Sequence, residues 1–330
     1  MKKIYYYPSC PPEGYANPYS LNYKKALEKY GDVLEKENNA VRPAIKGLVE
    51  NCLKGDLFVL NWIEGICNHR YGYIQYIIAF ICLFIIKLRK RKIVWTIHNM
   101  SSHSGTKATS RFLMLYFYRH SDLIITHSKQ AASVAKKKAH CPVYYVCHPF
   151  NQLQCCSDDV VKSIDVLIWG SILPYKGIPQ FLKQVNERHS KIKILIVGSC
   201  TDKGLETDIL KCVNENSNIV FDNRKPDFSE VAKYISSARY VLFPYIGHSI
   251  SSSGALMDTI VMGGTSIGPN VGSFKDLCED GICLTYENYN ELFYKLESDI
   301  IVSKEKVRDF IKTNSWENYA RFVISNLYER

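Results

Sequence analysis

A glycine-bounded loop in the second half of the chain has residue types suited to binding phosphate. Residues 170–177 read GSILPYKG and follow a run of apolar residues. Gly170 permits close backbone approach, the Ser171 hydroxyl can donate a hydrogen bond, and Lys176 supplies a positive charge. The loop therefore predicts a phosphate-binding site. A surface turn with a solvated lysine is the structural alternative.

A second loop with anion-binding character lies further along the chain. It carries three consecutive serines, Ser251, Ser252 and Ser253, and then Gly254, which opens a helical stretch. Free backbone N–H groups at a helix start attract anions, and serine hydroxyls add donors. One serine suffices as a helix cap, so three favour an anion site. Asp258, about one turn into this helix, is suited to bind ribose hydroxyls or else faces solvent.

The first half offers a histidine and a carboxylate at the ends of two apolar runs. Residues 95–99 read WTIHN and include His98, and residues 61–64 read NWIE and end at Glu64. His98 is suited to act as a base or as a hydrogen-bond donor to a sugar. Glu64 follows an aromatic residue closely, a combination that suits carbohydrate. The alternatives are a core histidine and a surface glutamate.

These loops need a scaffold, and the hydrophobic pattern predicts one. Short β-rich runs alternate with helical stretches, and most runs are continuously apolar, as expected for parallel strands covered on both faces. The expected strands are residues 3–7, 56–61, 93–97, 123–126, 143–146, 165–169, 192–197, 219–221, 240–243, 265–267 and 282–285. The alternation predicts an α/β protein with parallel sheets. Ligands bind such sheets at the carboxyl ends of the strands, where the loops above lie.

Chain length and one polar break predict two domains. The 330 residues exceed the usual size of a single domain. Residues 150–162 (FNQLQCCSDDVVK) are polar, lack a hydrophobic period and separate five expected strands from six. We therefore expect domains at residues 1–155 and 156–312. A last helical stretch at residues 315–328 has no strand after it and is free to pack elsewhere.

The charge of the chain favours anionic partners. The formal net charge is +10, and cations gather at residues 87–92 (KLRKRK) and 136–138 (KKK). Residues 73–86 are almost wholly apolar, but these fourteen residues rise only about 21 Å as a helix, short of the ~30 Å hydrocarbon core. A helix buried against a sheet fits this stretch, and so does a helix whose basic end contacts an anionic membrane surface.

Missing motifs argue against several function classes. The first strand is followed by PSCPPEGY rather than Gly-x-Gly-x-x-Gly, so a dinucleotide oxidoreductase does not fit. No nucleic-acid recognition motif occurs. The twelve cysteines show no zinc-type spacing, so a structural metal is not expected. The apolar run at the N-terminus is too short for a signal peptide, and a cytoplasmic location is expected.

Taken in order, these segments resemble the GT-B glycosyltransferases. They read WTIHN, LIITHS, GSILPYKG, LIVGS, ARYVLFPY, SSSGALMDTIVMGG and SWENYARF. The resemblance covers most of the chain and is nearest to the retaining, family 4-like enzymes of bacterial surface-polysaccharide synthesis. It implies two Rossmann-like domains whose parallel sheets face a central cleft, with the acceptor on the first and the donor on the second. It also implies that the C-terminal helix, at residues 313–330, crosses back onto the first domain.

The resemblance assigns roles to single residues. Lys176 matches the lysine that binds the donor phosphates, Asp258 the carboxylate that binds ribose, and His98 the histidine that touches the donor sugar. Ser171 stands where the family usually has arginine, and Ile250 stands where it has a first glutamate. Because of these two departures, the retaining or inverting outcome stays open.

The predicted reaction is transfer of a hexose from a nucleotide-diphosphate sugar to a saccharide or lipid-linked saccharide. The donor residues are Ser171, Lys176, Ser251, Ser252, Ser253 and Gly254 for the diphosphate, and Gly170, Tyr245 and Asp258 for the nucleotide. His98 and Glu64 are the catalytic candidates. No metal or other cofactor is expected, because no Asp-x-Asp motif occurs, and no nucleic-acid partner is expected, because no recognition motif is seen. Peripheral contact with an anionic membrane is expected, at the inner face of the cell membrane.

Two other functions fit the same sequence features. One is a nucleotide-sugar epimerase or hydrolase of the same fold, which would need acid and base carboxylates in the donor half. The other is a nonenzymatic protein that binds a sugar nucleotide.

Overall fold

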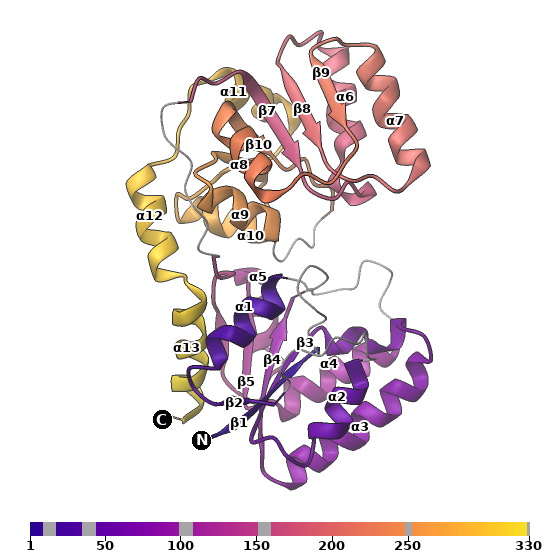
Figure 1. Ribbon diagram of the computed structural model, residues 1–330, viewed down its shortest axis with the longest axis vertical. Helices are drawn as coiled ribbons and strands as arrows, with labels where there is room; N and C mark the ends of the chain where they lie inside the picture. Colours follow the sequence, from indigo (N-terminus) through magenta and orange to yellow (C-terminus); the bar gives the residue numbers. More distant parts are fainter. Residues whose placement is uncertain (9–17, 35–43, 99–107, 151–159, 248–252, 329–330) are drawn as a thin grey trace. The chain divides into compact units, whose positions relative to one another are not determined.

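The chain folds into two compact units. The computed structural model describes residues 1–8, 18–34, 44–98, 108–150, 160–247 and 253–328. Unit 1 comprises Met1–Pro149 and Asn314–Arg330, and unit 2 comprises Phe150–Thr313. The end of the chain thus returns to the first unit, as the predicted fold class requires (Figure 1).

Unit 1 is built on a six-stranded sheet in which all neighbouring strands are parallel. The strands lie in the order β2-β1-β3-β4-β5-β6. Their bounds are β1 Lys3–Tyr7, β2 Asp32–Val33, β3 Leu57–Asn61, β4 Lys92–Ile97, β5 Leu123–Thr126 and β6 Val143–Tyr145. Every residue of β3 is buried, because helices cover both faces of the sheet.

Two apolar cores hold helices on the two faces of this sheet. The helices are α1 Pro18–Leu27, α2 Ala44–Asn51, the 3-10 helix η1 Ile63–Asn68, α3 Gly72–Leu88, α4 Ala108–His120, α5 Lys129–Lys136 and α13 Trp316–Tyr328. One core, here named the α3 core, joins α2, α3 and α4 to the sheet around Phe58 and Trp95. The other, named the α13 core, joins α1 and α13 to the opposite face around Tyr23 and Tyr319.

Unit 2 has its own six-stranded parallel sheet, in the order β12-β11-β10-β7-β8-β9. The strands are β7 Ile164–Trp169, β8 Ile194–Val197, β9 Ile219–Asp222, β10 Ala238–Leu242, β11 Ser266–Pro269 and β12 Leu284–Tyr286. The helices are η2 Pro174–Lys176, α6 Ile178–Glu187, α7 Lys203–Asn214, α8 Phe228–Ser237, α9 Gly254–Val261, α10 Gly272–Glu279, α11 Tyr289–Glu297 and α12 Lys304–Thr313. Side-chain caps fix several helix starts, such as Asp227, which forms a capping box with Glu230.

All eleven predicted strands are present within two residues of their expected bounds. The prediction missed β2, so unit 1 has six strands rather than five. This strand has only two residues, Asp32–Val33, which is too short to show any hydrophobic pattern.

Each sheet has one point where the strand order reverses. In unit 1 this point lies between β1 and β3, and in unit 2 it lies between β7 and β10. Loops leaving two such strands diverge to opposite sides and open a crevice at the carboxyl edge. The predicted loops at residues 170–177 and 244–254 follow β7 and β10, so they leave the sheet at the reversal point of unit 2.

Candidate functional site

The loop after β7 turns the Lys176 side chain back toward the end of the strand. Gly170 has φ +94°, a left-handed conformation that favours glycine. The loop is anchored where the N–H of Ile172 donates to the Ser199 carbonyl at 2.9 Å. It then forms η2 and ends at Gly177. A Cβ on Gly170 would lie 3.4 Å from the Lys176 ammonium nitrogen, so this amine sits directly over the glycine.

The loop after β10 is fastened to the loop after β7. The N–H of Ile246 donates to the Tyr175 carbonyl at 2.9 Å. Any side chain at Gly177 would collide with the Pro244 carbonyl, because a Cβ there would come within 2.2 Å of its oxygen. The two loops therefore form one wall at the reversal point of the sheet.

A tyrosine links Lys176 to the start of α9. The Lys176 ammonium lies 5.7 Å from the centre of the Tyr245 ring. The Tyr245 hydroxyl lies 3.3 Å from the Ser253 hydroxyl, and that hydroxyl caps α9 by accepting from the Leu256 N–H. The cation and the helix start therefore belong to the same small region.

Lys176 is a buried cation whose charge no described residue offsets. Its side chain is 6% exposed. Its ammonium makes no hydrogen bond or ion pair with any residue in the described part of the chain. Burial lowers the pKa of Lys176 to about 8. An anion bound here would pair with the Lys176 ammonium. The N–H groups at the start of α9 would also stabilise the negative charge of that anion.

The structure brings together four of the residues predicted for the donor. Gly170, Lys176, Tyr245 and Ser253 are linked by the contacts above. Ser171 lies on the same loop with its side chain exposed. Gly254 opens α9, and Asp258 lies one turn further on, half-buried. Ser251 and Ser252 lie outside the described residues, as does Ile250.

At the carboxyl edge of the unit 1 sheet, His98 is held between an amide and an indole. Its Nε2 lies 3.1 Å from the Asn61 carbonyl oxygen, and the Asn61 amide donates to the Tyr7 carbonyl at 3.2 Å. The Trp62 ring stacks on His98 at 3.9 Å, and Trp62 takes a left-handed backbone conformation with φ +52°. Since Nε2 must donate to Asn61, Nδ1 keeps its lone pair and can accept a hydrogen bond.

Two further histidines stand near His98, and the sequence analysis missed them. His127 follows β5, and its Nδ1 donates to the Val146 carbonyl at 2.8 Å. Its Nε2 therefore accepts from the Tyr19 hydroxyl, at 2.8 Å. His148 follows β6, and its ring centre lies 5.4 Å from that of His127. Their position just after two neighbouring strands was the signal that could have revealed them.

Burial keeps all three histidines neutral near pH 7. Burial, followed by the charges of His127 and His148, sets the pKa of His98 well below its usual value. Burial likewise lowers the pKa of His127 to about 3 and that of His148 to about 4. Among the described residues, no three His, Cys, Asp or Glu side chains are arranged to hold a metal ion. The histidines can therefore offer neutral donors and acceptors to a polar ligand.

Glu64, the second catalytic candidate, belongs to the other side of the sheet. It lies on η1, and its carboxylate accepts from the Trp95 indole at 3.2 Å. Burial raises its pKa to about 7, against the stabilising bond from Trp95. Trp95 is part of the α3 core, whereas His98 contacts Tyr19 on the side of the α13 core. The structure therefore does not bring Glu64 and His98 into one cluster.

Comparison with known proteins finds similar folds among solved structures of glycosyltransferases. No protein-family model and no curated protein sequence matches the chain. The structure of Anabaena HepE in complex with UDP-glucose matches with a TM-score of 0.63 at 14% identity, over 99% of this chain and 96% of that one. The trehalose-6-phosphate synthase OtsA matches with a TM-score of 0.68 at 11% identity, over 100% and 99%. The chain has the GT-B fold.

A third GT-B neighbour is similar over nearly the whole chain. AviGT4, a glycosyltransferase involved in avilamycin A biosynthesis, matches with a TM-score of 0.62 at 12% identity, over 99% of this chain and 97% of that one. Because these identities are low, the matches show the GT-B fold and not membership of one glycosyltransferase family.

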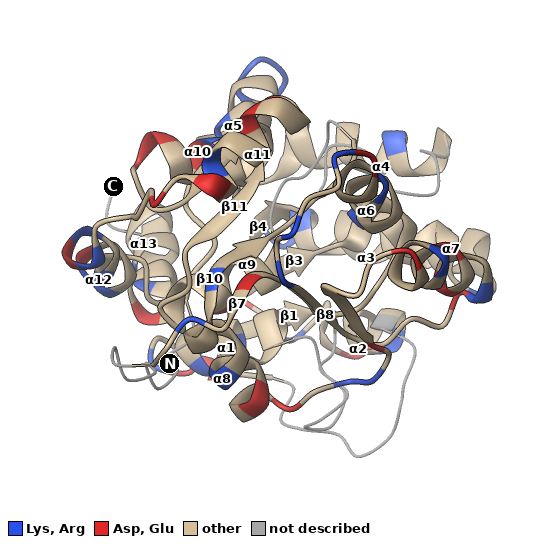
Figure 2. Cartoon of the chain, turned by 90° about the horizontal axis from the view of Figure 1, so that it is seen from above, with Lys and Arg blue, Asp and Glu red and all other residues tan. Residues whose placement is uncertain are grey.

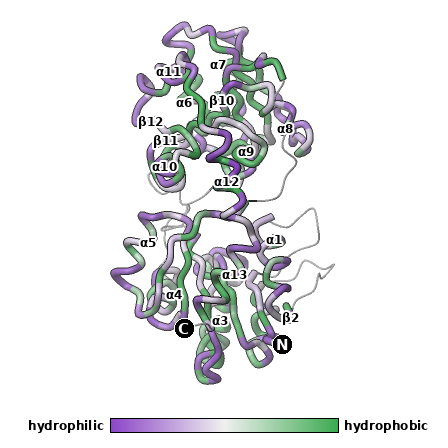
Figure 3. Tube along the Cα trace, turned by 90° about the vertical axis from the view of Figure 1, so that its left-hand side faces the viewer, coloured by the Kyte–Doolittle hydropathy of each residue, from purple (hydrophilic) through white to green (hydrophobic). Residues whose placement is uncertain are grey.

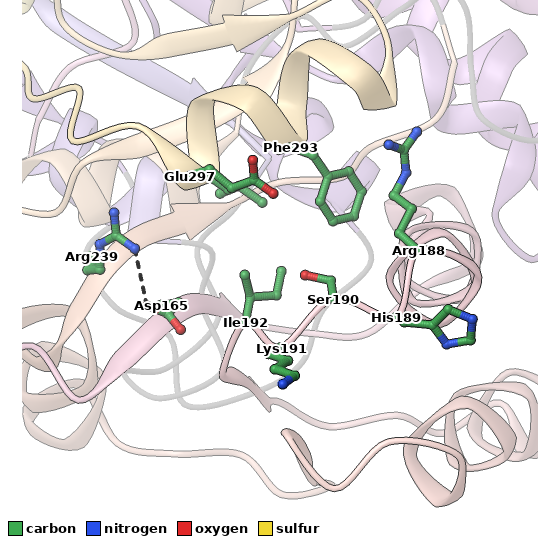
Figure 4. Close-up of a pocket in the computed structure, with 10 residues that line it drawn as sticks. Asp165, Arg188, His189, Ser190, Lys191, Ile192, Arg239, Phe293 and Glu297 are labelled. Atoms are coloured by element: carbon green, nitrogen blue, oxygen red, sulfur yellow. Dashed lines mark hydrogen bonds and ion pairs between the residues drawn. The ribbon is translucent and has the colours of Figure 1, made fainter.

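A separate cavity lies at the opposite edge of the unit 2 sheet. It has a volume of about 660 Å³ and is lined at the amino ends of β7, β8 and β10 (Figure 4). Both of its arginines have partners: Arg239 pairs with Asp165, and Arg188 donates to Asn290. The region around Lys176 differs, because no residue in the described ranges offsets the buried charge there.

Proposed function

We propose that the chain is a glycosyltransferase that moves a hexose from a nucleotide-diphosphate sugar to a saccharide or lipid-linked saccharide. The observation that carries the proposal is the buried cation Lys176, at the strand-order reversal of unit 2 and beside the start of α9. A diphosphate has the charge that such a site lacks. One of the similar HepE structures contains UDP and glucose, and another contains UDP-glucose. These ligands support a donor of this class.

The proposed chemistry is stabilisation of a leaving diphosphate. Negative charge builds on the diphosphate as the glycosidic bond lengthens. Lys176 and the α9 N-terminus, already in position, would stabilise that charge. Gly170 lets the phosphates approach the backbone, with Ser171 and Ser253 as hydroxyl donors. In this mechanism the protein's own groups meet the charge, so we propose that catalysis needs no metal.

The remaining donor roles are proposed for Asp258 and Tyr245 of unit 2 and for His98 of unit 1. Asp258 would accept hydrogen bonds from ribose hydroxyls, and Tyr245 would line the nucleotide. We assign His98 to the donor sugar, because its neutral ring has Nδ1 free of any described donor and able to accept from a sugar hydroxyl.

We further propose that the chain is a family 4-like enzyme of surface-polysaccharide synthesis. The ordered motifs of the sequence support this, while Ser171 and Ile250 depart from the family pattern. The acceptor would then be a growing lipid-linked saccharide at the inner face of the cell membrane. Peripheral contact with anionic lipid would bring the enzyme to it.

The first test is a panel of nucleotide-diphosphate sugars read by thermal shift and then by sugar transfer. A bound donor raises the melting temperature by mass action, and we expect a clear preference for one base. Lys176→Met should abolish the shift and reduce transfer about tenfold to a thousandfold. Lys183→Met is the matched control, because Lys183 is an exposed lysine of α6 in the same unit.

Each other outcome has a defined meaning. If the chain binds a donor and hydrolyses or epimerises it without transfer to any acceptor, the chain is a nucleotide-sugar hydrolase or epimerase and not a transferase. Donor binding without turnover would indicate a sugar-nucleotide binding protein. Unchanged donor binding in Lys176→Met would remove the basis of the proposal.

A further inference from the structure

Helix α3 is apolar on all sides, yet within the described ranges the protein buries only one of them. Its inner side contributes Ala79, Cys82, Leu83 and Ile86 to the α3 core. A helix that is apolar all round is normally buried all round. Figure 3 shows α3 as a hydrophobic stretch at one end of unit 1. The exposure of apolar side chains on its outer side therefore needs a separate explanation.

The outer side of α3 forms a continuous exposed surface with part of α4. Phe80 of α3 contacts Tyr116 of α4, with ring centres 5.3 Å apart, so the two helices are neighbours. Seven large apolar side chains of these helices are each 44–65% exposed, and we name them the apolar stripe: Ile74, Ile77, Ile81, Phe84, Leu88, Phe112 and Leu115. The α3 members follow helical spacing along one side. Together they expose roughly 600 Å², the upper end for an ordinary monomer.

The segment that carries the stripe is also strongly basic. Residues 65–121 contain nine Lys and Arg residues and no Asp or Glu, so this segment carries nine of the ten net positive charges of the chain. Ordinary surface helices such as α7 and α12 carry both signs (Figure 2). Part of the charge is met from outside the segment, since Asp122 accepts from Lys87 and Lys92. Asp56 similarly pairs with Arg91.

We propose that the apolar stripe docks unit 1 on an anionic membrane surface, with α3 lying in the plane of the interface. The stripe would enter the boundary between headgroups and acyl chains, while the surrounding cations would contact anionic headgroups. None of the helices in the described ranges is long and apolar enough to span a bilayer, so the contact is peripheral. The inference deepens the proposed lipid-linked acceptor by naming the surface that reaches the lipid.

Charge favours lipid over a second copy of the chain as the occupant. In a two-fold dimer each copy would present the same patch to the other. Each segment has nine cations, and even after the pairing with Asp56 and Asp122 both faces would keep a net positive charge and repel one another. An anionic bilayer offers both an apolar layer and the opposite charge.

The test is sedimentation of the full chain with vesicles in the absence of any donor. Vesicles of phosphatidylglycerol and phosphatidylcholine should bind the protein, and vesicles of phosphatidylcholine alone should bind it at least about tenfold less. Ile77→Gln with Phe84→Gln should weaken binding about tenfold or more, because both side chains lose apolar contact. Tyr294→Gln on α11, at a side chain 67% exposed, is the matched control and should leave binding unchanged.

A second readout reports insertion itself. In Phe84→Trp the added indole should shift its emission to the blue on vesicles and be quenched by brominated lipids. Equal vesicle binding by the double variant, or no binding by the parent chain at low salt, would overturn the proposal. A dimer that the double variant dissociates, with no vesicle binding, would assign the stripe to self-association instead. Since no donor is present, any of these results leaves the transferase proposal standing.

Discussion

Burial lowers the pKa of the basic side chains at the carboxyl edges of both sheets, with different consequences. The pKa of Lys176 falls to about 8, so the amine still carries its proton near pH 7, and no residue that the structure describes supplies a counter-charge. The pKa values of His98, His127 and His148 fall far enough that the rings are neutral. Unit 2 thus presents a cation suited to phosphate, and unit 1 presents uncharged polar rings suited to hydroxyl groups.

The buried charge of Lys176 should make the protein less stable than a variant with an uncharged side chain at position 176. The pKa of this lysine is about 8 in the folded chain, against 10.5 for an ordinary lysine. Between these values the unfolded chain binds a proton that the folded chain has lost, so the free energy of unfolding should rise with pH from 8 to 10.5. Below pH 8 the buried charge costs about 3 kcal/mol.

Lys176→Met should therefore raise the melting temperature at pH 7 while it abolishes donor binding. Chemical denaturation at several pH values should show that the free energy of unfolding of this variant no longer rises between pH 8 and 10.5. Lys183→Met should retain that rise. A Lys176→Met protein that is less stable at pH 7 would contradict the reading of Lys176 as a desolvated cation.

Glu64 allows a test that separates catalysis from stability. Its folded pKa of about 7 exceeds the ordinary 4.5, so the folded chain holds a proton that the unfolded chain releases between these values. The free energy of unfolding should fall as pH rises through this range. Glu64→Gln should remove this decrease in the free energy of unfolding. At pH 8 it should stabilise the chain by up to about 3 kcal/mol, and by less where water screens the carboxylate.

Turnover of Glu64→Gln decides the role of Glu64 in the reaction. We expect a rate within about threefold of the parent, because Glu64 contacts Trp95 in the α3 core and does not join the cluster around His98. A general base of an inverting reaction would instead lose a hundredfold to ten-thousandfold, roughly. A loss of that size in a Glu64→Gln protein that is still folded at the assay pH would restore Glu64 as the base.

At the scale of elements, the sequence predicted what depends on local pattern. The long apolar runs of β3 and β7 are visible in any window of the sequence, and the alternation with helices predicts parallel sheets. The two residues of β2 form a strand because they pair with β1. This pairing joins distant residues, so the local sequence pattern does not predict it. Helix α3 was expected either buried or at a membrane, but the structure buries one side only.

The candidate site was predictable where chemistry follows a strand directly. Lys176 and Ser253 lie in loops after β7 and β10, whose residue types pointed to phosphate. The cluster around His98 was less visible, because its members come from six separate segments. Tyr19 lies on α1, and Trp316 lies on α13 almost 300 residues later, yet both pack on the same rings. Only the folded structure brings such distant positions together.

At the scale of the whole molecule, the last segment of the chain ties the folding of unit 1 to the end of the sequence. Tyr319, Ala320 and Val323 of α13 are at most 2% exposed and complete the α13 core. The Tyr319 hydroxyl also lies 3.3 Å from that of Tyr19, which donates to His127. Unit 1 thus lacks part of its core until the chain has passed through all of unit 2.

Disrupting α13 should therefore unfold unit 1 and spare unit 2. Ala320→Asp puts a carboxylate among apolar side chains and should destabilise unit 1 by about 3 kcal/mol or more. Hydrogen exchange read by mass spectrometry should show lost protection in β1, β3 and α1 and retained protection in β7, β8 and α6. Arg321→Asp introduces the same residue at the next, exposed position and should change little. Equal loss of protection in both units would show that unit 2 does not keep its fold without unit 1.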